Sequence, residues 1–347
     1  MSNKYFYRDL DQIPTLSVFF GGRGTGKTFC FLKQIVEHAA GSDRRFMWLR
    51  ETKAIVDIIK KGNSLTAPIE KVDPDFPSVL IESGAGVSEF WTYHMEPDEN
   101  TGKEKPVQDE KIGYLAALST FANARGIDFS DVDWIIFDEF IPEDGTVQRK
   151  YMGEKLLNLY ETVNRNREME GSQPVKLVML TNTNTPFSDY LSVFGLDEII
   201  DDLKKGYYRD PDVLIEFCSN KDFRQEKAST FLYRRAKSQR FLSMALDNDF
   251  TISKALVLKK PSLKGSKPLF CVGDSQTYVC TVLSDGKMFF RKGFNKDLQY
   301  YDMSDEQQEM LFRFLFTDKL RQVYIRGAMY FDSIYTQKTI LEYAKLI

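Results

Sequence analysis

The chain has 347 residues, of which 42% are hydrophobic and 28% charged, and its formal net charge is −3. This composition is that of a folded globular protein, and the length allows two domains or one large domain with an insertion. The small negative charge excludes a chain that is basic throughout, so any contact with nucleic acid needs local basic surfaces. Four cysteines without a C-x-x-C pair, and two histidines, give no pattern for a disulfide framework or a zinc site. No apolar run reaches the roughly 18 residues that cross a bilayer, so we expect no membrane contact.

The first predicted elements are those of a parallel α/β sheet. Leu16–Phe20 is a short apolar run, typical of a buried strand, and Phe29–Ala40 has the spacing of a helix that stops before Gly41. A second strand is expected at Arg45–Leu49. Because strands and helices alternate, we expect a parallel sheet covered by helices.

A glycine-rich loop joins the first strand to the first helix. Residues 21–28 read GGRGTGKT and match the pattern G-x-x-x-x-G-K-[ST] in full. In this pattern backbone N–H groups surround the β-phosphate, the lysine reaches the β- and γ-phosphates, and the last hydroxyl ligates magnesium. The helix that follows adds the positive end of its dipole. We therefore predict a site for ATP and Mg²⁺, with Thr28 as a metal ligand and with phosphate-binding residues Gly21, Gly22, Arg23, Gly24, Thr25, Gly26, Lys27 and Thr28.

Residues from about 51 to 118 interrupt the alternation of strands and helices. Val79–Ile81 and Phe90–Tyr93 predict the two strands of a hairpin. Pro97–Glu110 is polar and has no apolar periodicity, which predicts a mobile loop. We interpret the region as an inserted lid subdomain.

Two adjacent acids follow the next apolar strand. Trp134–Phe137 leads into Asp138 and Glu139, at the strand end where ligands bind in such sheets. Asp138 is predicted to support the magnesium shell, and Glu139 to orient and deprotonate the attacking water. The pair is typical of P-loop ATPases of the additional-strand class, and the chain lacks a correctly spaced guanine signature. The alternative is a pair of surface acids at a strand end.

A polar segment follows the strand expected at Val175–Leu180. Asn182 is our candidate for sensing the γ-phosphate or positioning water, and the alternative is a turn in which asparagine side chains cap the backbone.

Two arginines lie near the end of the helical segment Lys150–Glu168. Arg165 or Arg167 could complete the site of a neighbouring subunit by stabilising transition-state charge. The alternative is a solvated basic face favoured by the helix dipole. Arg125, in the loop before the two-acid strand, is a second candidate for the same role or for coupling. Arg23 could touch the γ-phosphate of its own subunit or only brace the loop.

The chain changes character beyond residue 210. A stretch between Arg224 and Lys267 is rich in arginine and lysine, which would suit contact with a phosphate backbone or a solubilising helix face. A second, smaller α/β domain is predicted from about residue 258. Its expected strands are Leu269–Val272, Tyr278–Leu283, Met288–Arg291 and Gln322–Ile325, and its expected helices are Asp305–Phe316 and Ser333–Lys345.

Together these segments resemble the DNA-packaging ATPases of phi-29-like bacteriophages, relatives of the terminase large subunits. The resemblance is carried by GGRGTGKT (21–28), FMWLRETK (46–53), WIIFDEF (134–140), ETVNRNRE (161–168), LTNTNTPFSDYL (180–191) and MALDNDF (244–250). It implies a P-loop ATPase domain at 1–205 with the lid at about 51–118. It also implies a linker domain at 206–256 and an RNase H-like α/β domain at 257–347 that has lost its nuclease.

The resemblance also implies a function and partners. Members of this family form a homomeric, five-membered ring on the portal vertex of an empty prohead, drive double-stranded DNA inward with ATP, and use a packaging RNA. The trans-acting arginine of the family falls on Arg165, and its coupling lysine on Arg125, where the charge is kept but the geometry changes. The expected location is the cytoplasm of the infected bacterial host, with transient docking on the prohead and absence from the mature virion.

Three other functions are weighed against this one. A terminase with an active nuclease would need clustered carboxylates, whereas Asp274, Asp285 and Asp332 are scattered in the sequence. A nucleotide-dependent assembly protein would bind ATP without moving DNA. A helicase would show paired helicase core domains, which we do not find.

Overall fold

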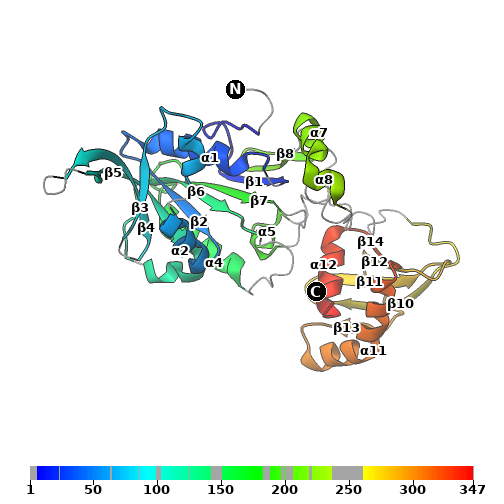
Figure 1. Ribbon diagram of the computed structural model, residues 1–347. Coiled ribbons are helices and arrows are strands. Elements are labelled where there is room, and N and C mark those ends of the chain that lie inside the picture. Colours follow the sequence, from blue (N-terminus) through cyan, green and yellow to red (C-terminus); the bar gives the residue numbers. More distant parts are fainter. Residues whose placement is uncertain are drawn as a thin grey trace. The chain divides into compact units, whose positions relative to one another are not determined.

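The chain divides into two compact units, which are described separately. The larger holds the described residues up to 194 and those from 206 to 236, and the smaller holds residues 195, 196 and 199 and those from 261 to 346 (Figure 1). The computed structural model describes residues 6–22, 24–62, 65–84, 86–98, 103–124, 126–141, 151–182, 188–196, 199, 206–218, 221–236 and 261–346.

A nine-stranded sheet forms the larger unit, in the order β3-β4-β5-β2-β6-β7-β1-β9-β8. The six strands from β5 to β9 in this order pair in parallel, and β3, β4 and β8 pair antiparallel at the two edges. β7 lies between β1, which precedes the phosphate loop, and β6, which ends in the two acids. It is the additional strand that the sequence predicts. The strands are β1 (Leu16–Gly21), β2 (Arg45–Arg50), β3 (Val79–Ser83), β4 (Ser88–Pro97), β5 (Glu104–Ala117), β6 (Val132–Asp138), β7 (Lys176–Thr181), β8 (Tyr207–Arg209) and β9 (Val213–Cys218).

Helices cover both faces of this sheet (Figure 1). On one face, Phe31 and Ile35 of α1 pack into a cluster with Trp48 of β2. On the other, the ring of Phe137 in β6 lies 5.0 Å from that of Tyr190 in α5, which contacts α4. The central strands are apolar on both sides because both sides are buried. The helices are α1 (Lys27–Ala39), α2 (Lys53–Gly62), α3 (Ala67–Glu70), the 3₁₀ helix η1 (Leu118–Ala124), α4 (Met152–Asn164), α5 (Asp189–Ser192), α7 (Lys221–Ser229) and α8 (Phe231–Arg235).

The region expected to be a separate lid extends the main sheet instead. β5 pairs in parallel with β2, with Phe46 opposite Gly113, and the β3–β4 hairpin continues the sheet beyond it. The loop expected at 97–110 is wrong for residues 104–110, which are the first part of β5. That part of the β4–β5 ribbon is exposed on both sides. It therefore lacks the apolar alternation by which strands are recognised.

The predicted boundary of the linker domain at residue 206 also differs from the structure. β9 pairs with β1 throughout, with Gly21 opposite Cys218, and β8 pairs with β9, so residues 207–218 belong to the sheet of the larger unit. The basic helices α7 and α8 follow β9 directly. The end of the expected linker lies outside the described residues.

A five-stranded sheet in the order β13-β10-β11-β12-β14 forms the smaller unit. β10, β11 and β12 are an antiparallel meander, β13 pairs in parallel with β10, and β14 pairs in parallel with β12. Phe270, Phe312 and Phe331 lie in its core. The elements are β10 (Lys267–Gly273), β11 (Thr277–Val282), β12 (Met288–Lys292), β13 (Tyr300–Asp302), α11 (Glu306–Ile325), β14 (Met329–Phe331) and α12 (Ile334–Tyr343).

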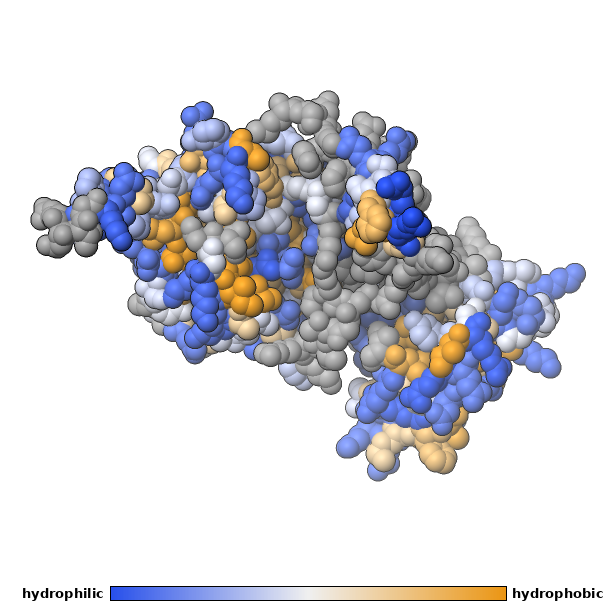
Figure 2. Space-filling model, viewed as in Figure 1, coloured by the Kyte–Doolittle hydropathy of each residue, from blue (hydrophilic) through white to orange (hydrophobic). Residues whose placement is uncertain are grey.

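One expected strand of this unit is wrong. Gln322–Ile325 is the last turn of α11, and the strand comes later, at Met329–Phe331. Gly327 separates the two with a positive φ of 65°, which favours glycine after a helix. An α/β fold is therefore present, and its likeness to RNase H stays a prediction. Among the described helices, none is long and apolar enough to cross a membrane. On the face shown in Figure 2, hydrophilic residues are widespread and hydrophobic residues form patches.

Candidate nucleotide-binding site

The phosphate loop lies between β1 and α1, as the sequence predicts. Gly24 and Gly26 have φ values of 78° and 96°, in the region that favours glycine. Within the described residues, α1 has no side-chain cap and no acid in its first turn. Its N-terminal N–H groups and dipole therefore suit an anion such as phosphate. Arg23 lies outside the described residues.

The amine of Lys27 is folded back into this loop. Its Nζ donates to the carbonyl oxygen of Gly21 at 2.8 Å, to Thr25 Oγ1 at 3.2 Å and to Asn182 Oδ1 at 3.2 Å. Burial lowers the pKa of Lys27 to about 8, although the nearby Asp138 acts in the opposite direction. A bound triphosphate would supply the negative charge that favours the protonated amine.

Asp138 lies directly beside the loop, at the end of β6. Thr28 Oγ1 donates to Asp138 Oδ1 at 3.1 Å. Burial raises the pKa of Asp138, and the charge of Arg50 opposes that rise. A hydroxyl and a carboxylate are oxygen donors of the kind that Mg²⁺ prefers, so this pair fits the predicted metal.

Glu139 follows Asp138 in a left-handed conformation, with φ of 53°, which turns its side chain out of the strand. The side chain is 46% exposed, within reach of solvent. Asn182 lies just beyond the end of β7, and its Nδ2 is 3.5 Å from Glu139 Oε1. The structure thus brings Lys27, Thr28, Asp138, Glu139 and Asn182 to one edge of the sheet.

Arg50 is a site residue that no sequence motif indicated. Its Nη1 donates to Asp138 Oδ2 at 2.6 Å and its Nη2 to Glu139 Oε2 at 2.5 Å. Arg50 ends β2, which pairs with β6 in a register that puts Leu49 opposite Phe137. A charged residue at the end of an apolar strand was the available signal, since the ends of parallel neighbours meet at one edge.

Arg165 does not belong to this edge. It caps the C-terminus of α4, and its Nη1 lies 3.4 Å from Asp128 Oδ1, before the start of β6. The seven residues of β6 span about 20 Å, so the length of the strand separates Arg165 from Glu139 of its own chain. Arg125, the other candidate arginine, lies outside the described residues.

Comparison with known proteins identifies this chain from its sequence. The model of the Podovirus DNA encapsidation protein (Gp16) family matches residues 92–338. The chain belongs to this family. Its function is therefore the packaging of viral DNA, and the family resemblance seen in the sequence is confirmed.

Two relatives are described as DNA packaging proteins. The DNA packaging protein of Bacillus phage B103 is 26% identical over 258 residues, which cover 74% of this chain and 70% of the relative. The DNA packaging protein of Bacillus phage phi29 is 25% identical over 276 residues, covering 78% and 74%.

Solved structures confirm the fold class. The chain is similar to a protein of the bacteriophage Phi-29 viral genome packaging motor assembly, with a TM-score of 0.62, 21% identity, and coverage of 96% of this chain and 95% of the other. A protein of the Phi-28 gp11 DNA packaging motor gives a TM-score of 0.59, 21% identity, and coverage of 97% and 95%.

Proposed function

We propose that this encapsidation protein hydrolyses ATP with Mg²⁺ and uses the energy to drive double-stranded DNA into a prohead. The observation that carries the proposal is the approach of four groups at one sheet edge: the loop amine Lys27, the hydroxyl of Thr28, and the carboxylates Asp138 and Glu139. A protein that only binds nucleotide needs the first three of these groups. The fourth, a half-exposed carboxylate beside the others, suits hydrolysis.

Each residue has a separate role in the proposed reaction. The backbone of the loop, from Gly21 through Arg23 to Thr28, and the amine of Lys27 hold the triphosphate. Thr28 and Asp138 hold Mg²⁺, which when bound would neutralise charge on the β- and γ-phosphates. Glu139 orients a water molecule and accepts its proton.

Two neighbours hold the carboxylate of Glu139 in place. The Nη2 of Arg50 donates to its Oε2 at 2.5 Å. Asn182 links Lys27 to Glu139 through the two ends of its amide. Its Oδ1 accepts from Lys27 Nζ at 3.2 Å, and its Nδ2 donates to Glu139 Oε1 at 3.5 Å. A γ-phosphate that binds Lys27 would therefore also change the surroundings of Glu139.

Arg165 acts across subunits in this proposal. The length of β6 separates it from its own Glu139, and its side chain is 52% exposed, so a neighbouring subunit can bring its nucleotide to it. A trans-acting arginine stabilises the charge of the transferring phosphoryl group. The active form is therefore a homomeric ring, which we propose has five subunits. From the family resemblance, we also propose that Arg125 couples hydrolysis to movement.

The partners follow from the family. We propose that the ring docks transiently on the portal vertex of the prohead in the host cytoplasm, contacts a packaging RNA, and is absent from the mature virion. Contact with DNA or RNA is supported by the helices α7 and α8, whose last turns carry Lys227, Arg234 and Arg235.

The test is packaging with purified parts. Proheads, DNA, ATP and the protein are combined, and packaged DNA is scored by its resistance to added nuclease. We expect protection that requires hydrolysable ATP. ATP binding without DNA-stimulated hydrolysis or protection would indicate an assembly protein instead.

A further inference from the structure

The turn after α4, which carries Arg165, is fixed to the rest of the larger unit on both sides of that residue. Asn164 is 6% exposed, and its Oδ1 accepts a hydrogen bond of 2.8 Å from the backbone N–H of Val175. Its Nδ2 donates to Glu168 Oε2 at 3.1 Å. Arg165 itself has φ of 48° and ψ of −129°, a conformation that residues other than glycine rarely adopt. Such a conformation persists only where its surroundings hold it.

Arg167 fastens the other side of the turn to the start of β6. Its guanidinium donates to Asp133 Oδ1 at 3.1 Å and to the carbonyl oxygens of Ser130 and Val132 at 2.7 and 2.6 Å. The side chain is 11% exposed. A guanidinium with three acceptors in fixed directions holds its own backbone in one place.

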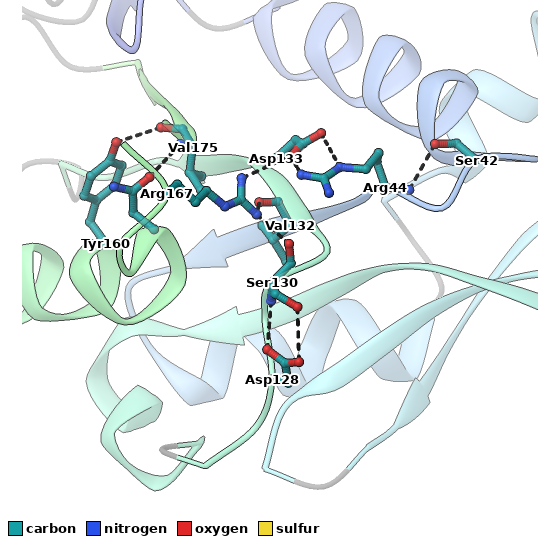
Figure 3. A network of polar contacts seen from close by, with 10 residues as sticks. Ser42, Arg44, Asp128, Ser130, Val132, Asp133, Tyr160, Arg167 and Val175 are labelled. Atoms are coloured by element: carbon teal, nitrogen blue, oxygen red, sulfur yellow. Dashed lines mark hydrogen bonds and ion pairs between the residues drawn. The ribbon is translucent and has the colours of Figure 1, made fainter. Parts of the chain in front are cut away.

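Asp133 is in turn held by a second arginine. Arg44 Nε donates to Asp133 Oδ2 at 2.7 Å, and Arg44 Nη2 donates to Asp133 Oδ1. Figure 3 shows Arg44 and Arg167 approaching Asp133 from opposite sides. The two arginines and the aspartate, which we call the Asp133 brace, thus join the start of β2, the start of β6 and the turn after α4.

The side chain of Arg165 is held far less than the backbone beneath it. In the described part of the chain its ion pair is with Asp128, at 3.4 Å, and that aspartate side chain is 69% exposed. An exposed pair of this length contributes little and is easily exchanged for another anion. The turn therefore combines a fixed backbone with a side chain that is ready to change partner.

We propose that Arg167, through the Asp133 brace, is a positioning residue that holds Arg165 at the place where the neighbouring subunit presents its nucleotide. The inference rests on the proposed trans role of Arg165, and it gives Arg167, which the sequence offered as an alternative trans-acting arginine, a different part in the reaction. The simpler reading is that Arg167 only stabilises the fold. The two readings differ because a purely structural loss affects every activity of the subunit, whereas a positioning loss affects only the neighbour's hydrolysis.

The experiment compares Arg167→Gln, which loses the charge and most of the donors, with Arg167→Lys, which keeps the charge but not the fork. In rings of Arg167→Gln we expect the turnover number for ATP to fall by about 10- to 100-fold, the loss that a displacement of about 1 Å can cause. ATP affinity of the isolated subunit should stay within about twofold of the parent, because its own phosphate loop is intact. Arg167→Lys should recover part of the turnover.

Mixed rings then locate the defect. Arg167→Gln subunits, whose own loop is intact, are mixed with Lys27→Ala subunits, whose arginine turn is intact, and hydrolysis should return at interfaces between the two. Mixing Arg167→Gln with Arg165→Ala should give no return, because both variants lack the same contribution. If ATP hydrolysis returned in the mixture with Arg165→Ala but not in the mixture with Lys27→Ala, the proposal would be overturned. That result would place the defect of the Arg167→Gln subunit in the nucleotide site of the same subunit.

Two further results keep the test decisive. If a mixture of Arg165→Ala and Lys27→Ala subunits recovers no ATP hydrolysis, Arg165 does not act across subunits. The positioning role of Arg167 is then also excluded, because it depends on that trans role. If Arg167→Gln does not fold, as judged by its thermal unfolding, Arg44→Gln replaces it, because it loosens Asp133 and leaves Arg167 in place. Equal loss of ATP affinity and turnover in Arg44→Gln and Arg167→Lys would also overturn the proposal.

Discussion

The guanidinium of Arg50 bridges two carboxylates, meeting Asp138 at 2.6 Å and Glu139 at 2.5 Å. One side chain from β2 thus touches both the predicted metal-supporting acid and the predicted base. We expect Arg50→Gln to raise the pKa of Asp138 further, because the charge of Arg50 opposes the effect of burial. The protonated form of Asp138 is a poorer magnesium ligand. The acid limb of the profile of kcat/KM against pH should therefore move to higher pH, and the Mg²⁺ concentration for half-maximal activity should rise.

Arg50→Lys is the matched control for this change. It keeps the positive charge but reaches only one carboxylate well, so its profile should lie between those of the parent and Arg50→Gln. An unchanged acid limb in Arg50→Gln would show that Arg50 does not govern the ionisation of Asp138.

Glu139→Gln should keep ATP binding and lose turnover. The amide has nearly the same size but cannot accept a proton, and general-base catalysis typically contributes about 10²- to 10⁴-fold. ATP binding is measured by titration with a fluorescent analogue, and turnover by phosphate release. Normal phosphate release would remove the role assigned to Glu139.

The lowered pKa of Lys27 predicts that ATP affinity depends on pH. Below about 8 the amine carries its charge, and above that value it loses the proton in the free protein. Because the triphosphate favours the charged amine, binding above pH 8 must take up a proton, and affinity should fall by up to about tenfold per pH unit. Calorimetry in buffers of different ionisation enthalpy at pH 9 should detect the uptake. Lys27→Ala should bind more weakly and without this dependence, and an equally strong dependence in that variant would assign the proton to another group.

The smaller unit is expected to have no nuclease activity. Asp274 accepts hydrogen bonds from Ser275 Oγ at 2.9 Å and from the backbone N–H of Gln276 at 3.4 Å, contacts that suit a turn residue. Plasmid DNA incubated with the protein and Mg²⁺ should stay supercoiled. Nicking that disappears in Asp274→Ala would contradict this and would favour a terminase with an active nuclease.

The sequence predicted those parts of the molecule in which local pattern and burial agree. The phosphate loop, the strand before it and the two acids at the end of β6 lie where the sequence placed them, because each combines an apolar run with a motif. The first half of β5 was missed, since residues exposed on both faces of a ribbon carry no apolar alternation. The end of α11 was taken for a strand because a short apolar run fits either structure.

Contacts between distant segments account for what was missed in the site. Arg50 reaches Asp138 across 88 positions of the chain, and only the pairing of β2 with β6 makes them neighbours. The same holds for Arg167, which the sequence offered as one of two exchangeable arginines near the end of α4. The structure distinguishes them: the guanidinium of Arg167 donates to three acceptors, whereas the side chain of Arg165 is half exposed.

The pairing of β9 with β1 has a mechanical consequence. The last residue of β9, Cys218, stands opposite Gly21, where the phosphate loop starts, and the positively charged helix α7 begins at Lys221, three positions later. A shift of the phosphate loop on binding a triphosphate would therefore act on the end of β9, its neighbouring strand. The nucleotide site and the proposed nucleic-acid contact of α7 would then be linked through a single strand end.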